Sequence, residues 1–146
     1  MTDLERAIET YHSGSYPFVL VKHGHITATG TRAGIGELLQ ALAESPDAMR
    51  GASLADRVVG KAVAMVAVFA EISEVYTPLG SESAVAVLAK HRIPFQAQRI
   101  IPFIQNRRND GPCPMERLTL PISDPEVAVA ALKAFVAQRG ELAHVM

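Results

Sequence analysis

The single cysteine is the residue of this chain with the clearest chemical potential. Cys113 stands between Pro112 and Pro114, after the basic pair Arg107 and Arg108. A residue that precedes proline avoids the helical region, so the thiol is held on stiff, extended backbone. A thiolate is a strong nucleophile, and nearby arginines favour it if the fold brings them close. A lone cysteine is also commonly a small buried hydrophobe, so a structural role stays open.

Two charged residues are candidates to act with this thiol. Glu116 lies three residues after Cys113 and can serve as a base, an orienting group or a partner for Lys61. Lys61 can bind an anion, or form an imine if it is desolvated. The alternatives are a surface salt bridge for Glu116 and an internal ion pair of Lys61 with Asp56 or another carboxylate. We therefore expect Cys113, Lys61 and Glu116 to be the catalytic candidates.

The stretch 51–70, GASLADRVVGKAVAMVAVFA, must position Lys61. It predicts a short strand, a tight turn at Asp56 and a helix that is apolar on nearly every side, as buried helices are. Asp56 is a favoured N-cap residue, and the free backbone N–H groups at a helix start can hold an anion. We therefore expect Asp56, Gly60 and Lys61 to form a ligand-binding site for an anionic group.

The same helix predicts part of the hydrophobic core. Val63, Val66 and Phe69 lie on it. Because the helix is apolar all round, we expect these three side chains to be almost wholly buried.

Strands and helices alternate along the rest of the chain. Thr2 and Glu5 have the spacing of a capping box, and Gly24 divides a tight hairpin. The predicted elements are a helix over 2–12, strands over 17–23 and 25–29, a helix after the glycines at 30, 34 and 36, a strand over 74–78, a helix over 81–92, strands over 95–104 and 117–122, and a final helix to about 138 capped by Asp124 or Ser123. This order predicts an α/β sandwich with a mixed sheet.

The composition limits the class of protein. The chain has 146 residues, enough for one domain, which we expect to span residues 1–146, and its net charge of -1 gives no electrostatic footprint for nucleic acid. One cysteine allows no internal disulfide, which favours a reducing compartment. The first residues lack the apolar core of a signal peptide, and the longest apolar run, 62–70, is too short to span a bilayer. We therefore expect a soluble, cytoplasmic protein without membrane or nucleic-acid partners.

Four segments, in this order, resemble a known family: LADRVVGKAVA, ESAVAVLAKHRIP, IPFIQNRR and GPCPMER. They are similar to a family of small bacterial and archaeal proteins known as a domain of unknown function with a cytidine deaminase-like fold. The resemblance covers about residues 17–136, and its specific parts are the VGKA and CPME segments. It implies a three-layer α/β/α sandwich with a mixed central sheet, and by analogy of fold a homodimer or a larger homo-oligomer.

The zinc chemistry of deaminases does not carry over to this sequence. Zinc deaminases have H-x-E at one helix start and P-C-x-x-C at the next. The corresponding helix starts read TRAGIGE and ADRVVGK, and neither offers a His or Cys ligand. Cys113 follows a proline, but Glu116 stands where the second cysteine is required. We therefore expect no bound metal and no cofactor.

These observations lead to two main hypotheses on function, and a purely structural assembly protein is a third. The first is a site for an anionic or nucleotide-like metabolite, in which a nonzinc enzyme uses Cys113 as nucleophile or acid and Lys61 stabilises negative charge. In that shared pocket Asp56, Gly60 and Lys61 form one wall, and Cys113 and Glu116 form the other. The alternative is a noncatalytic binding or regulatory module on a deaminase-like scaffold. An unknown small molecule is the expected partner in both cases.

Overall fold

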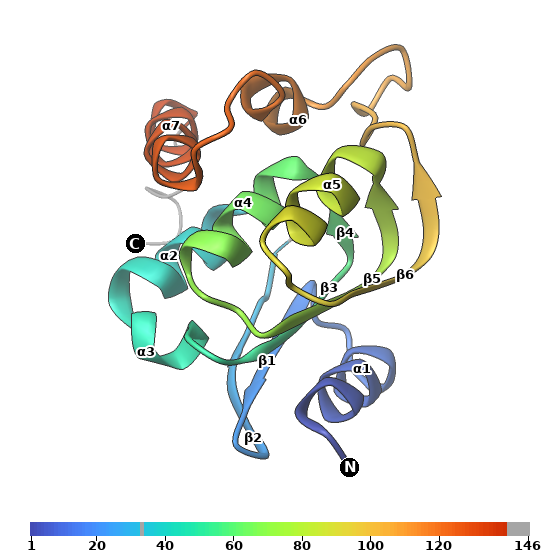
Figure 1. Ribbon diagram of the computed structural model, residues 1–146, viewed down its shortest axis with the longest axis vertical. Coiled ribbons are helices and arrows are strands. Elements are labelled where there is room, and N and C mark those ends of the chain that lie inside the picture. Colours follow the sequence, from blue (N-terminus) through green and yellow to red (C-terminus); the bar gives the residue numbers. More distant parts are fainter. Residues whose placement is uncertain (33, 140–146) are drawn as a thin grey trace.

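The computed structural model describes residues 1–32 and 34–139 and has an α/β fold built on a mixed sheet (Figure 1). The helices are α1 (Asp3–Ser13), α2 (Gly36–Glu44), α3 (Pro46–Met49), α4 (Lys61–Phe69), α5 (Glu82–Lys90), α6 (Pro114–Thr119) and α7 (Pro125–Gln138). The strands are β1 (Phe18–Lys22), β2 (His25–Thr29), β3 (Ser53–Asp56), β4 (Val58–Val59), β5 (Glu74–Ser81) and β6 (Phe95–Ile101). No helix among these described residues is long and apolar enough to cross a membrane.

The sheet combines antiparallel and parallel strand pairs. β1 pairs antiparallel with β2 and with β3, whereas β3, β5 and β6 are parallel neighbours. After a break at Arg57, β4 follows β3 and pairs with the end of β5. Strand β6 pairs along one edge of β5 over nearly its whole length. The other edge of β5 is therefore shared by β3 and β4. The expected mixed sheet is therefore confirmed, with the order β2, β1, β3 and β4 together, β5, β6.

Helices cover both faces of this sheet (Figure 1). On one face α1 packs against β1 and β3, around a small apolar cluster that contains Ala7 and Tyr76. On the other face α4 and α5 lie over the strands, and α7 packs against α4. Side chains alternate between the two faces of a strand, so Leu20 and Leu54 belong to this second, larger core.

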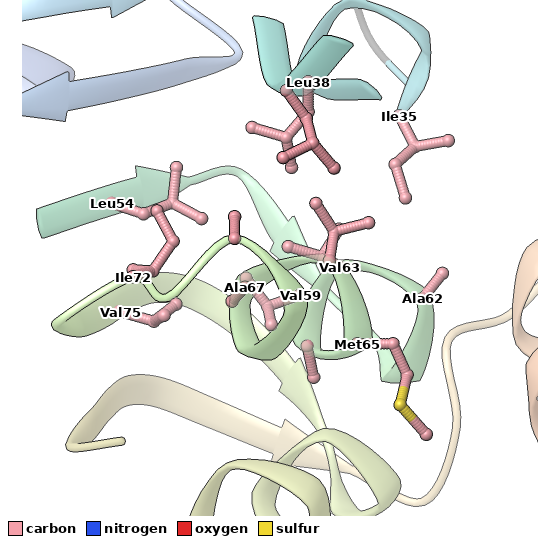
Figure 2. Packing of buried hydrophobic residues seen from close by; sticks show 14 of the residues in the cluster. Ile35, Leu38, Leu54, Val59, Ala62, Val63, Met65, Ala67, Ile72 and Val75 are labelled. Carbon is pink, nitrogen blue, oxygen red and sulfur yellow. The ribbon is translucent and has the colours of Figure 1, made fainter. Parts of the chain in front are cut away.

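Helix α4 lies in the middle of the larger core (Figure 2). Val63 points from α4 toward Leu38 of α2 in that view. The expected burial is confirmed for Val63 and Val66, which are 9% and 0% exposed. It is wrong for Phe69, which is 43% exposed. Phe69 is the last residue of the helix and lies on its uncovered side, since the next residue, Ala70, is only 6% exposed.

Local capping signals predicted two helix starts correctly. The side chain of Thr2 accepts a hydrogen bond from the backbone N–H of Glu5, and the Glu5 carboxylate accepts one from the backbone N–H of Thr2. Asp124 caps α7 in the expected way. The predicted hairpin turns at His23 and Gly24, which both have positive φ, as a tight turn requires.

The strand expected over 117–122 is wrong, because its first residues belong to helix α6. Cys113 caps this helix, and Pro114 occupies its first position. Proline at the first position is a signal for a helix start, since its missing N–H and fixed φ cost nothing there. This local signal outweighs the alternation of apolar residues that favoured a strand.

The turn and cap expected at Asp56 also differ from the structure. Asp56 ends β3, and β4 separates it from helix α4. Gly60 takes the N-cap position of α4, without a side-chain hydrogen bond. Asp56 is therefore free to face the space in front of the helix.

Candidate functional site

A cavity opens at the end of β3, between the starts of α2 and α4 and the segment that precedes α6. Its volume is about 180 Å³, close to the roughly 150 Å³ at which an apolar cavity accepts a benzene ring. The lining residues are Pro17, Gly34, Ile35, Asp56, Arg57, Val58, Gly60, Ala62, Val63, Ile104, Cys113, Met115 and Glu116. Apolar walls with a few polar groups are typical of sites for small molecules.

Glu116 is buried in the cavity wall, with only 1% of its surface exposed. Its carboxylate accepts hydrogen bonds from the backbone N–H of Lys61 (2.8 Å), the hydroxyl of Ser83 (3.2 Å) and the backbone N–H of Ile104 (2.6 Å). These donors satisfy a charge whose burial would otherwise be very costly. The carboxylate therefore joins the starts of α4 and α5 to the segment that follows β6.

The anion at the start of α4 is thus the protein's own Glu116. Gly60 makes this close approach possible, because a Cβ at that position would lie 3.1 Å from both carboxylate oxygens and 2.8 Å from Cγ1 of Ile104. Its φ of -96° is accessible to any residue, so the requirement is for space. The backbone site expected to hold an anionic ligand is occupied by a side chain.

The side chain of Lys61 points to α6. Its Nζ donates a hydrogen bond to the backbone carbonyl of Leu120 at 2.8 Å, at the C-terminal end of α6. Burial lowers the pKa of Lys61, and the charge of Glu116 opposes this shift. Lys61 is not among the residues that line the cavity. In contrast to the expected shared pocket, the structure does not bring its ammonium group into the cavity that Cys113 lines.

Asp56 lines the cavity at the end of β3. Its Oδ1 accepts a hydrogen bond at 3.4 Å from the backbone N–H of Val58, and the described residues supply no ion pair for it. Burial raises the pKa of Asp56 to about 7, although hydrogen bonds from the backbones of Val58 and Arg57 and the charge of Arg57 oppose the shift. A weakly bonded carboxyl group that titrates near neutral pH in a cavity is a candidate for ligand binding.

Cys113 lines the cavity and also begins helix α6. Its Sγ accepts a hydrogen bond at 3.3 Å from the backbone N–H of Glu116, on extended backbone as predicted. Burial raises the pKa of the Cys113 thiol, and hydrogen bonds from the backbones of Glu116 and Met115 offset this only in part. Arg107 and Arg108 are exposed and are not among the groups that shift it. The group is therefore a neutral thiol that caps a helix.

The structure brings together four of the five predicted site residues. Asp56, Gly60, Cys113 and Glu116 all line one cavity. Sequence reasoning missed Arg57, which lines it as well. The available signal was the position of Arg57 directly after a predicted strand, since ligands of α/β folds bind at the carboxyl ends of strands.

A metal site was not expected from the sequence. In the part of the chain that the structure describes, no group of three or more His, Cys, Asp or Glu side chains could hold a metal ion. The absence of bound zinc remains a prediction for elemental analysis.

The fold and the family are established by comparison with known proteins. No curated protein matches the chain. The crystal structure of a DUF1893 family protein, TM1506 from Thermotoga maritima, matches with a TM-score of 0.83 over 92% of this chain and 90% of that chain. The two sequences are 19% identical, so this likeness shows the fold alone. The family model described as TM1506, domain of unknown function (DUF1893), matches residues 6–136. This match covers most of the chain, which therefore belongs to the TM1506 (DUF1893) family.

Proposed function

We propose that this chain is a small-molecule-binding domain and that its ligand enters the cavity beside Asp56. The observation that carries the proposal is the pairing of an apolar cavity of about 180 Å³ with a carboxyl group that has no ion pair among the described residues. Burying such a group costs free energy unless it gains hydrogen bonds. A ligand that donates hydrogen bonds to Asp56 supplies them.

The size and polarity of the cavity define the part of the ligand that enters it. The volume suits one ring rather than a whole nucleotide. The walls contributed by Ile35, Val63, Ile104 and Met115 are apolar. The entering group is therefore a single ring whose polar edge carries N–H donors, and a positive charge at that edge strengthens its bond to ionised Asp56.

Of the two sequence hypotheses, the noncatalytic binding module has the better support. Cys113 is a helix cap whose pKa is raised, which reduces the thiolate fraction. The carboxylate of Glu116 already accepts three hydrogen bonds, so it is poorly placed to act as a base. A nonzinc enzyme that uses Cys113 would need both groups to be released on binding.

The proposal includes the cytidine deaminase-like scaffold implied by the sequence resemblance. It is supported by the order of strands, with β1 antiparallel beside three parallel neighbours, and by helices on both faces of the sheet. The cavity lies at the starts of α2 and α4, the two helix starts that correspond to the H-x-E and P-C-x-x-C segments of zinc deaminases. Ile35 and Gly60 stand at these starts and cannot ligate zinc.

Two probes with the same ring and opposite charge test the binding proposal. At pH 8, calorimetry is expected to show tighter binding of benzamidine than of benzoate, because the amidinium group donates to the ionised Asp56 carboxylate. Asp56→Asn is expected to weaken benzamidine binding by about tenfold, since a hydrogen bond between charged groups is lost. Glu9→Gln, which removes a carboxylate from the exposed side of α1, is the matched control and leaves the affinity unchanged. Equal binding of the two probes, or no effect of Asp56→Asn, contradicts the proposal.

A further inference from the structure

A second hollow lies beside the cavity, formed by the end of α1, the segment that follows it and Arg57. Its volume is about 310 Å³. It is rich in groups that donate hydrogen bonds, and its lining residues are Tyr11, His12, Gly14, Ser15, Tyr16 and Arg57. Within the described ranges, no acidic side chain lines it. This set of donors without a carboxylate favours an anionic group.

The two hollows meet at Arg57, which lines both. The backbone N–H of Arg57 donates a hydrogen bond to the carbonyl of Pro17 at 3.0 Å and so holds two chain segments together. On one segment Pro17 lines the cavity and Tyr16 the second hollow, and on the other Asp56 lines the cavity while Arg57 lines both. Arg57 is therefore the residue through which a ligand in one hollow can contact the other.

The guanidinium group of Arg57 is available to a ligand. The residue is exposed, and its side chain has no hydrogen bond or ion pair in the part of the chain that the structure describes. The charge of Arg57 lowers the pKa of the neighbouring Asp56 carboxyl group, but by less than burial raises it. A guanidinium fork without a protein partner matches the oxygens of a phosphate group.

His12 forms a fixed part of the wall of the second hollow. Its Nε2 lies 2.9 Å from the hydroxyl oxygen of Tyr76, which is a buried residue of β5. Its ring also packs edge-on against Tyr11, with centroids 5.2 Å apart. The donors of this hollow are therefore carried partly on side chains that the fold holds in place.

We infer that the cavity and the second hollow form one extended site, which takes a ligand with an aromatic ring at one end and a phosphate group at the other. This inference rests on the proposed function, because the ring occupies the cavity and donates to Asp56. The phosphate group binds Arg57 and the donors of His12, Ser15 and Tyr16. A nucleotide-like or phosphorylated aromatic metabolite fits this description, with its negative charge held by Arg57 and not by Lys61.

A matched pair of probes separates the two halves of the site. 4-Aminobenzyl alcohol and 4-aminobenzylphosphonate share the ring and its amine, and only the second carries a phosphate-like group. In calorimetry at low salt and pH 8, the phosphonate is expected to bind wild-type protein about tenfold more tightly than the alcohol. Arg57→Gln is expected to remove this advantage without changing the affinity for the alcohol. Arg6→Gln changes an exposed residue of α1 outside both hollows and is the matched control. It is expected to keep the advantage of the phosphonate over the alcohol.

Each outcome decides one of the two proposals. Equal affinity for the two probes in wild-type protein, or an advantage that survives in Arg57→Gln, overturns the extended site while the cavity proposal stands. If Asp56→Asn leaves the affinity for the alcohol unchanged, or if the alcohol does not bind at all, the cavity proposal fails and the extended site with it. Tyr16→Phe provides a second variant, which is expected to weaken only the phosphonate, and a thermal melt confirms that each variant is folded.

Discussion

Asp56 and Glu116 both line the cavity, and their carboxyl groups differ in how strongly they are hydrogen-bonded. Glu116 accepts three hydrogen bonds of 2.6–3.2 Å from protein donors, whereas Asp56 accepts weaker ones from the backbones of Val58, at 3.4 Å, and Arg57. A buried polar group with strong hydrogen bonds holds the fold together, and one with weak hydrogen bonds gains more from a ligand that donates to it. The two residues therefore have separate roles, structural for Glu116 and ligand-binding for Asp56.

Cys113 is expected to react slowly for a cysteine. Its pKa is raised by burial, so less thiolate is present at pH 7.5 than in a free thiol. Because the chain has one cysteine, the rate of alkylation by iodoacetamide reports on this residue alone. We expect a rate constant below that of glutathione under the same conditions. A rate well above that of glutathione would mean that the thiol is activated, and would favour the enzymatic hypothesis.

At the scale of the elements, three segments meet at one carboxylate. The starts of α4 and α5 and the segment after β6 each donate one hydrogen bond to Glu116, which itself belongs to α6. Gly60 leaves the space that this convergence requires. The cavity wall is thus assembled by one side chain that links elements far apart in the sequence.

The stability of the protein should depend strongly on Glu116. Glu116→Ala leaves the partly buried backbone donors of Lys61 and Ile104 without their acceptor and removes a buried side chain, so we expect it to lower the free energy of unfolding by about 3 kcal/mol. Glu116→Gln keeps one acceptor oxygen and is expected to cost less. Glu9→Ala, on the exposed side of α1, is the matched control. Urea unfolding measures all three, and a loss below about 1 kcal/mol for Glu116→Ala would contradict the linking role.

Local capping and turn signals in the sequence predicted most helices and strands correctly. The errors concern features that depend on packing between elements far apart in the sequence. The capping box at Thr2 and the cap at Asp124 act locally, so α1 and α7 were predicted close to their observed bounds. The exposure of Phe69 depends on which side of α4 the other elements cover, and the sequence of the helix does not state this.

Much of the candidate site could be predicted, but the direction of its side chains could not. Asp56, Gly60, Cys113 and Glu116 were assigned to one pocket from their residue types, and they line one cavity, although Cys113 and Glu116 were expected before a strand and not at a helix start. The side chain of Lys61 turns to the carbonyl of Leu120, a contact between residues 59 positions apart. A contact of that range depends on the packing of α6 beside α4 and has no local sequence signal.

For the whole molecule, the sheet holds the Asp56 carboxyl group where water stabilises its charge poorly. The folded protein keeps the proton of Asp56 up to about pH 7, whereas an unperturbed Asp carboxyl group has a pKa of 3.8. The stabilising contribution of this raised pKa is present at low pH and is lost as the pH rises from about 4 to about 7, because the unfolded state ionises first. A ligand that stabilises the ionised carboxylate offsets this loss, so binding and pH are coupled.

The pH dependence of benzamidine binding tests the central claim, that Asp56 in this cavity receives the ligand, most directly. Between pH 5.5 and pH 8.5 benzamidine remains cationic while Asp56 ionises. We expect its affinity for wild-type protein to rise by about tenfold or more, with a midpoint at or below pH 7, because binding favours the ionised carboxylate. The Asp56→Asn variant is expected to show weak binding that does not change with pH. A flat profile for wild-type protein, or the same rise in Asp56→Asn, would contradict the account.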